Sequence, residues 1–134
     1  MRAKTLLASA AIVLGVGTGV ALAHDHGEDK DAATGAAGES KTVTGEVLDL
    51  ACYAAHEAKG EKHKSCAQAC VQGGAPVGLL TADGHVYLLV ENHDAKKPYE
   101  ELKTKAAEQV KVTGTFFERG GLPAIVVASV EKAN

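Results

Sequence analysis

Residues 76–90, PVGLLTADGHVYLLV, contain the clearest local folding signal in the chain. Two apolar runs, Pro76–Leu80 and His85–Val90, are joined by the tetrapeptide Thr81-Ala82-Asp83-Gly84. An Asp-Gly pair between two such runs is the strongest short-range signal for a β-hairpin. The sequence therefore predicts two antiparallel strands in this stretch.

A further strand is predicted upstream of the hairpin, over Lys41–Leu50 (KTVTGEVLDL). Its apolar and small residues alternate from Val43 to Val47, and the phase of the alternation then shifts at Leu48. A glycine together with a phase shift inside one strand predicts a bulge or a sharp coil near Gly45.

Downstream of the hairpin, the pattern predicts one helix and two more strands. Pro98–Gln109 (PYEELKTKAAEQ) has proline at a suitable first helical position, acidic residues early and lysines later, an order that suits the helix dipole. Val110–Glu118 alternates as a strand, Gly120-Gly121 turns the chain, and Leu122–Val130 supplies the last strand.

The predicted order is strand, insertion, strand, strand, helix, strand, strand. Five strands with a helix between the third and the fourth resemble the OB-fold, a small Greek-key barrel. The resemblance covers Val43 to Val130 and implies a mainly β domain over residues 42–134. The chain departs from the usual pattern in its long first connection, residues 51–75, which we predict to be a helical insertion.

All three cysteines of the chain belong to this insertion. Two stretches, Ala51–Ala58 and Glu61–Gln72, are compatible with helices and are separated by a glycine. In the second stretch His63, Cys66 and Cys70 follow the spacing i, i+3, i+7. Side chains at this spacing lie on one face of a helix, so these three can point together toward the end of the first strand.

Three thiols and one imidazole are the ligand set of a tetrahedral zinc or copper(I) centre. His56 is a reserve ligand, because it follows the first cysteine by one helical turn. Asp49 is placed where it can orient a ligating imidazole. We therefore predict a metal site formed by Cys52, His63, Cys66 and Cys70.

The insertion is similar to that of small secreted bacterial proteins of unassigned function, which carry a Cys-Tyr, a Gly-x2-His, a Cys-Ala and a further Cys within an OB-like domain. In this chain the corresponding residues are Cys52-Tyr53, Gly60 to His63, Cys66-Ala67 and Cys70. The resemblance implies a fold and a site, and it implies no particular activity.

The same thiols have a second interpretation. In an oxidising compartment Cys52 can form a disulfide with Cys66 or Cys70, which would join the insertion to the first strand and leave one free thiol. The chain would then be a disulfide-stapled OB-like interaction module that binds a cell-envelope protein or ligand, with no metal. A thiol redox enzyme is a third interpretation, but the chain has no CxxC pair.

Residues 1–23 have the pattern of a secretory signal peptide. Arg2 and Lys4 precede an uncharged apolar run that closes on Ala21-Leu22-Ala23, with small residues at the positions expected before a cleavage site. The apolar run is also shorter than the roughly 20 residues that a spanning helix needs. We therefore expect a periplasmic or secreted protein that is free of the membrane after cleavage.

Residues 24–41 are acidic and contain no branched apolar residue, which predicts a disordered linker. Cleavage after Ala23 would place His24 at the N-terminus and His26 in third position, where the two can chelate copper(II) or nickel(II). The alternative is a solubilising tail in which both histidines are incidental.

Charge and composition exclude several other functions. The formal net charge is −3, and loss of the two basic leader residues makes it −5, which does not suit a nucleic-acid-binding protein. Beyond Met1 the chain has no methionine, which excludes a copper site of the Cys–His–Met type. No nucleophile motif, phosphate-binding glycine loop or catalytic carboxylate pair is recognisable, so binding is favoured over catalysis.

Overall fold

The computed structural model describes residues 38–133. The expected leader, and the linker up to residue 37, lie outside the described residues. No helix within residues 38–133 has the length and hydropathy needed to span a bilayer. The elements are, in chain order, β1 (Glu39–Asp49), α1 (Leu50–His56), the short 3-10 helix η1 (Glu61–His63), α2 (Lys64–Gln72), β2 (Val77–Leu80), β3 (Val86–Val90), α3 (Lys97–Leu102), β4 (Gln109–Arg119) and β5 (Leu122–Lys132).

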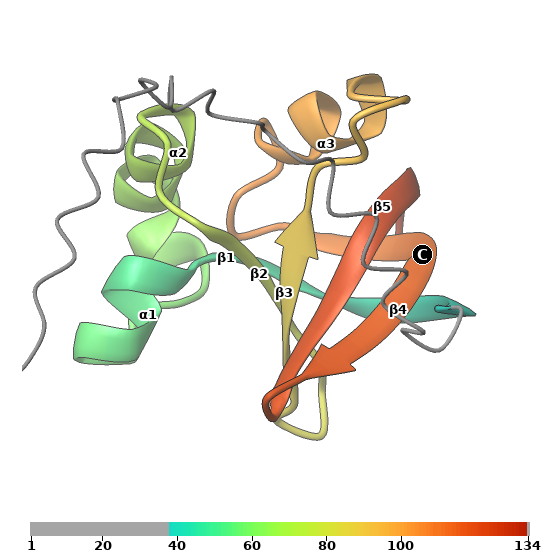
Figure 1. Ribbon diagram of the computed structural model, residues 1–134. Helices are drawn as coiled ribbons and strands as arrows, with labels where there is room; N and C mark the ends of the chain where they lie inside the picture. The colour runs from blue at the N-terminus through green and yellow to red at the C-terminus, as the bar shows by residue number, and fades with distance from the viewer. Residues whose placement is uncertain (1–37, 134) are drawn as a thin grey trace, which may run out of the picture. The chain divides into compact units, whose positions relative to one another are not determined.

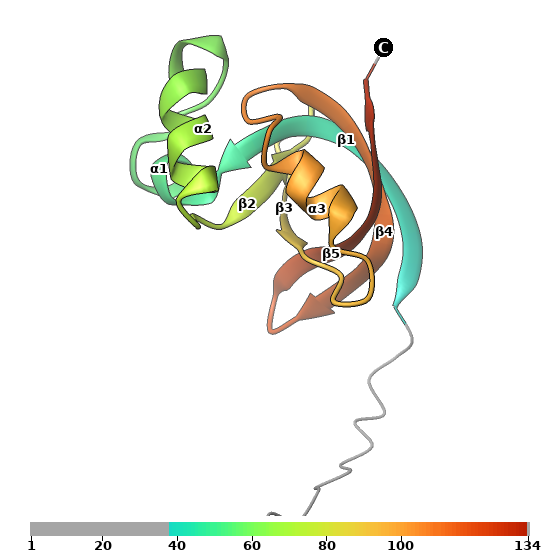
Figure 2. The same ribbon diagram turned by 90° about the horizontal axis from the view of Figure 1, so that it is seen from above.

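The five strands form a closed barrel in the order β1-β2-β3-β5-β4 (Figure 1). Neighbouring strands are antiparallel, except that β3 and β5 run parallel. The domain is thus mainly β, and its barrel is compatible with the OB-like fold that the sequence predicts. Seen from above, α3 lies over the barrel, while α1 and α2 stand together at one side (Figure 2).

The predicted hairpin is confirmed, with β2 and β3 paired through Leu79 and Tyr87. Its turn is closed by Thr81, whose backbone N–H donates to the carbonyl of His85 at 2.9 Å and whose hydroxyl accepts the N–H of His85 at 3.1 Å. Gly84 has φ of 88°, a left-handed conformation that favours glycine. The Asp-Gly signal therefore identifies the turn correctly.

Strand β1 is continuous, and the predicted phase shift marks the place where it changes partner. Residues up to Glu46 pair with β4, and residues from Glu46 onward pair with β2. A Cβ on Gly45 would meet the backbone carbonyl of Leu80, so glycine allows the close approach of β1 to β2. A register irregularity does occur elsewhere, between Thr113 and Gly114 in the pairing of β4 with β5.

Helix α3 is shorter than the predicted Pro98–Gln109. It begins at Lys97 with proline in its first turn, as the sequence indicates, but it ends at Leu102. The chain beyond it pairs with β1 instead, because Ala107 donates its N–H to the Val47 carbonyl at 2.8 Å. Tertiary hydrogen bonding therefore overrides the local helical propensity of residues 103–109.

The insertion forms two helical segments, as predicted, although α1 ends at His56 and the second segment begins as the 3-10 turn η1. The connection between them is held by Gly60, whose N–H donates to the Glu46 carboxylate of β1. Helix α2 is held by Gln68, whose side-chain amide donates to the Lys103 carbonyl at 2.6 Å. The insertion is therefore attached to β1 through the connection between its helical segments, and to the end of α3 through α2.

The hydrophobic core lies inside the barrel. Val71 of α2 is fully buried in this cluster and is its only member from the insertion among the described residues. The other buried members come from the strands and from α3: Val43, Val47, Val77, Leu79, Leu89, Leu102, Val110, Val112, Ile125 and Val127.

Candidate metal site

Cys52 lies in the first turn of α1, directly after the end of β1. Helix α1 begins at Leu50 because Asp49 caps it, with Oδ1 accepting the N–H of Ala51 at 2.9 Å and the N–H of Cys52 at 3.4 Å. Asp49 is also the last residue of β1 and is 1 % exposed. The capping carboxylate therefore connects the rigid barrel to the helix that carries Cys52.

His63 and Cys66 come from the second helical segment. His63 closes η1 and is the N-cap of α2, and its backbone N–H donates to the Gly60 carbonyl at 2.9 Å. Gly60 has φ of 74°, a value that favours glycine, and its own N–H is bound by Glu46. Gly60, the glycine that separates the two helical segments, thus also sets the position of His63.

The candidate ligands form two groups that share Cys52. In the first group one ligand atom each from Cys52, His63 and Cys66 lies within 4.8 Å of the others. In the second group the same holds for Asp49, Cys52 and Cys70. Two sulfur ligands of one tetrahedral zinc ion lie about 3.8 Å apart, because each Zn–S bond is about 2.3 Å. Both groups are therefore close enough to hold a metal ion after small side-chain movements.

Two polar atoms at this site are buried without a partner. Nε2 of His63 and Oδ2 of Asp49 have no hydrogen bond to any residue of the described part. A buried polar atom without a partner loses the free energy of solvation that water would supply. A cation bound next to either atom would satisfy it, since each atom can donate a lone pair.

The Asp49 carboxylate dominates the electrostatics of the neighbouring thiols. Its own pKa is raised by burial, but the Cys52 thiol, the N–H groups of the first turn of α1 and the Cys70 thiol outweigh this effect and bring it below its ordinary value. Interaction with the Asp49 carboxylate, followed by partial burial, raises the pKa of Cys52 to about 12. Partial burial, the same carboxylate and the Cys66 thiol also raise the pKa of Cys70. The thiols approach Asp49 without full hydrogen-bond alignment, as the unpartnered Oδ2 shows.

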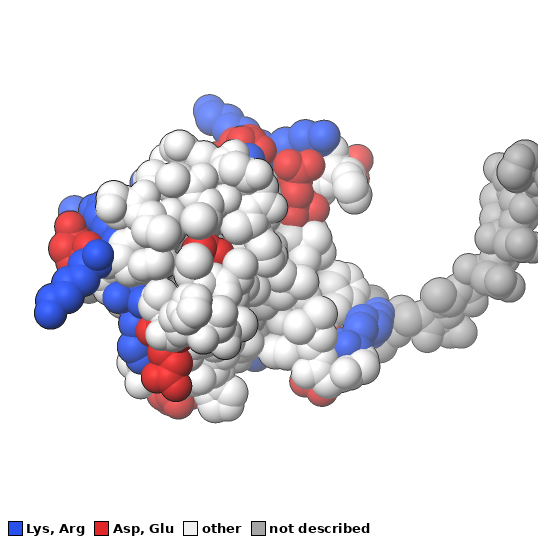
Figure 3. Space-filling model, turned by 90° about the vertical axis from the view of Figure 1, so that its left-hand side faces the viewer, with Lys and Arg blue, Asp and Glu red and all other residues white. Residues whose placement is uncertain are grey.

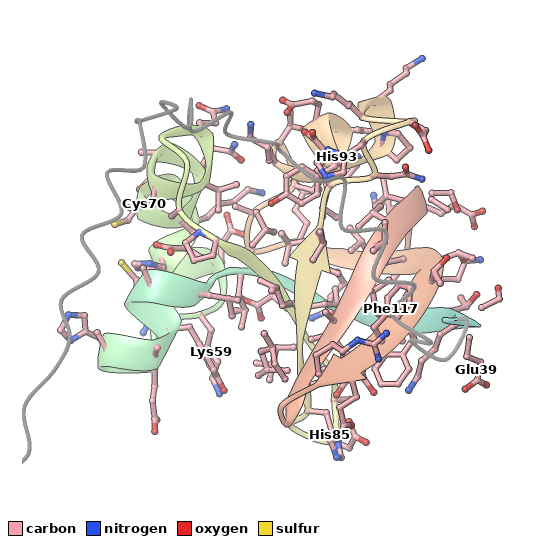
Figure 4. The ribbon with its side chains drawn as sticks, viewed as in Figure 1. Glu39, Lys59, Cys70, His85, His93 and Phe117 are labelled. Atoms are coloured by element: carbon pink, nitrogen blue, oxygen red, sulfur yellow. The ribbon has the colours of Figure 1, made fainter. Side chains whose placement is uncertain are left out.

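All three cysteines are free thiols in the structure. The disulfide of the second interpretation is therefore not formed here. Cys70 lies on α2, well away from His85 and His93 on the two sides of β3 (Figure 4). The structure thus groups Cys52 and Cys66 with His63, whereas Cys70, which was predicted to share that site, is grouped with Cys52 and Asp49.

Each remaining candidate from the sequence can be placed. His56 is exposed at the end of α1 and belongs to neither group. His24 and His26 lie outside the described residues. Asp49 was expected beside an imidazole, but the structure groups it with two cysteines. An Asp directly before a helical stretch is a recognisable N-cap signal, and this signal was available in the sequence.

Comparisons with protein families, with curated proteins and with solved structures find no match to this chain.

Proposed function

We propose that this chain is an exported metal-binding protein that holds a soft metal ion, zinc or copper, in the Cys/His insertion. The observation that carries the proposal is the convergence of Cys52, His63 and Cys66 within 4.8 Å, with Nε2 of His63 buried and unpartnered among the described residues. Sulfur and imidazole ligands suit zinc and copper(I) and suit harder cations poorly.

Cys70 adds a third thiol to the site. It lies within 4.8 Å of Cys52 and, like it, is partly buried. A site with three thiols and one imidazole on a rigid scaffold is suited to sequestering a metal ion, delivering it, or using it as structural support. The proposal includes export, which comes from the leader pattern of residues 1–23, and it includes no catalytic step.

The experiment is to purify the chain from the bacterial periplasm without chelator and to measure its metal content and its thiols. We expect bound zinc or copper and, after metal removal, three alkylatable cysteines. Absence of any bound metal together with a disulfide to Cys52 would refute the proposal. The alternative, a disulfide-stapled interaction module without metal, would then be favoured.

A pair of histidine variants identifies the site. His63→Ala removes the buried imidazole and should weaken metal binding more than about tenfold. His56→Ala is the matched control, because it removes an imidazole from the same insertion that is exposed and lies in neither group. Equal effects of the two changes would contradict the assignment of His63.

A further inference from the structure

The two ligand groups share one residue, the thiol of Cys52, and otherwise consist of different residues. We propose that the insertion holds two divalent ions, zinc rather than copper(I), with the Cys52 thiolate bridging them. His63 and Cys66 complete the first position, and Asp49 and Cys70 complete the second. This inference rests on the proposed function and adds to it the number and the kind of ion.

The second position is supported by the state of the Asp49 side chain. Asp49 is 1 % exposed, and its Oδ1 is used by the N–H groups of the first turn of α1. Its Oδ2 is buried, has no hydrogen-bond partner within residues 38–133, and belongs to a residue grouped with two thiols. A carboxylate oxygen is an ordinary zinc ligand, whereas copper(I) prefers thiolate, thioether and imidazole.

The charge of the cluster favours two divalent ions over one. When both positions are filled, three thiolates and one carboxylate contribute four negative charges, and two zinc ions cancel them. One zinc ion in the first position, held by the Cys52 and Cys66 thiolates, would leave the buried Asp49 carboxylate without a cation, which is costly.

Lys64, the residue after His63, does not take the place of the second ion. Its ammonium group pairs with Glu61 at 3.8 Å and with Glu108 at 3.2 Å. The face that α1 and α2 present is largely uncharged, with the lysine and arginine side chains at its edges (Figure 3). A second cation is therefore the available source of positive charge.

The test is a zinc titration of the metal-free chain under reducing conditions, with stoichiometry read by native mass spectrometry. We expect two zinc ions per chain. Cys66→Ser should retain one ion, held in the second position, and Cys70→Ser should retain one ion, held in the first. Far-UV circular dichroism checks that each variant keeps its fold.

Asp49→Asn tests the carboxylate, because asparagine keeps an oxygen that can cap α1 but loses the negative charge. It should weaken the second zinc ion at least about tenfold and leave the first in place. Asp94→Asn, a change at an exposed aspartate outside both groups, is the matched control and should leave both ions bound.

Three results separate the possibilities. Binding of one zinc ion only, abolished by either cysteine change, would overturn the two-ion cluster and leave the proposed function standing as a mononuclear site. Two ions that are both retained in Asp49→Asn with unchanged affinity would overturn the second position as assigned. Binding of neither zinc nor copper would instead refute the proposed function itself.

Discussion

At the scale of single residues, Asp49 has the largest influence on the site. It ends β1, caps α1 through Oδ1, and has a second oxygen, Oδ2, that is buried and has no hydrogen-bond partner within residues 38–133. In the metal-free protein its charge stabilises the protonated forms of Cys52 and Cys70, since both pKa values are raised by its proximity. Metal binding must therefore displace protons from these thiols.

Proton release is the first expected consequence. Because the pKa of Cys52 is about 12 and that of Cys70 is raised, both thiols are protonated at pH 7 in the metal-free chain. Zinc binding at pH 7 should release about two protons or more, and zinc affinity should rise with pH between pH 6 and about 9. Calorimetry in buffers of different ionisation enthalpy measures the release. Affinity independent of pH would show that these thiols are not ligands.

Alkylation of Cys52 gives the second prediction. Replacing Asp49 by Asn removes the carboxylate that keeps the thiol protonated, so the pKa of Cys52 should fall from about 12 toward its ordinary value. Each unit of decrease raises the thiolate fraction about tenfold. Iodoacetamide labelling of metal-free protein at pH 8, mapped by mass spectrometry, should therefore be faster at Cys52 in Asp49→Asn than in Asp94→Asn. Equal rates would argue against the carboxylate as the cause.

At the scale of elements, α1 depends on its ends rather than on its packing. The helix has no buried residue, and it is stabilised by the Asp49 cap at one end and by a left-handed residue at the other. That residue is Glu57, with φ of 53°, whose N–H donates to the Tyr53 carbonyl at 2.8 Å. Glycine usually occupies this position because it has no Cβ.

Glu57→Gly should therefore stabilise the fold. Glycine adopts the left-handed conformation without strain, but it also gives the unfolded chain more conformational freedom. The net effect should be an increase of about 0.5 kcal/mol in the free energy of unfolding. Glu57→Ala, which keeps the strain, should bring no such gain. Urea denaturation of the two variants makes the comparison. A lower midpoint for glycine than for alanine would contradict the interpretation of the α1 end.

At the scale of the whole molecule, the core of the barrel is built almost entirely without the insertion. The core cluster is built from the strands and α3, and Val71 is its only contribution from the insertion within the described part. The candidate ligands lie outside this cluster, at the last residue of β1 and on the connection between β1 and β2. Loss of the metal should therefore leave the packing of the barrel intact.

Metal removal tests whether the packing of the barrel is independent of the site. After chelation, amide hydrogen exchange should accelerate over residues 50–66, where the helices depend on caps and ligands, while β4 and β5 stay protected. The β-sheet signal in circular dichroism should change little. Cooperative unfolding of the barrel on chelation would show that the metal stabilises the whole domain.

Local patterns predicted much of this architecture. The hairpin, the strand positions and the two helical segments of the insertion follow from alternation, from glycines and from turn residues, which act over a few positions. The end of α3 could not be predicted in this way. Residues 103–109 favour a helix, but Ala107 and Glu108 hydrogen bond to Val47, which is distant in sequence.

The spacing of His63, Cys66 and Cys70 identified donors of the candidate site, but it predicted that all three point together. In the structure His63 is the N-cap of α2 and is grouped with Cys66, while Cys70 belongs to the other group. The residues that complete each group could not be predicted from the spacing. The grouping of Asp49 with Cys52 and Cys70 depends on the direction in which the chain leaves the barrel, and no local pattern specifies that direction.

The sequence by itself determined the order of the elements and the sulfur and imidazole chemistry of the insertion, since both depend on residue identity and short spacing. Only the tertiary structure decided how those donors divide into two groups around Cys52 and which carboxylate joins them. The physical reason is that the barrel holds the end of β1 against α2, and this contact joins residues that no short-range interaction connects.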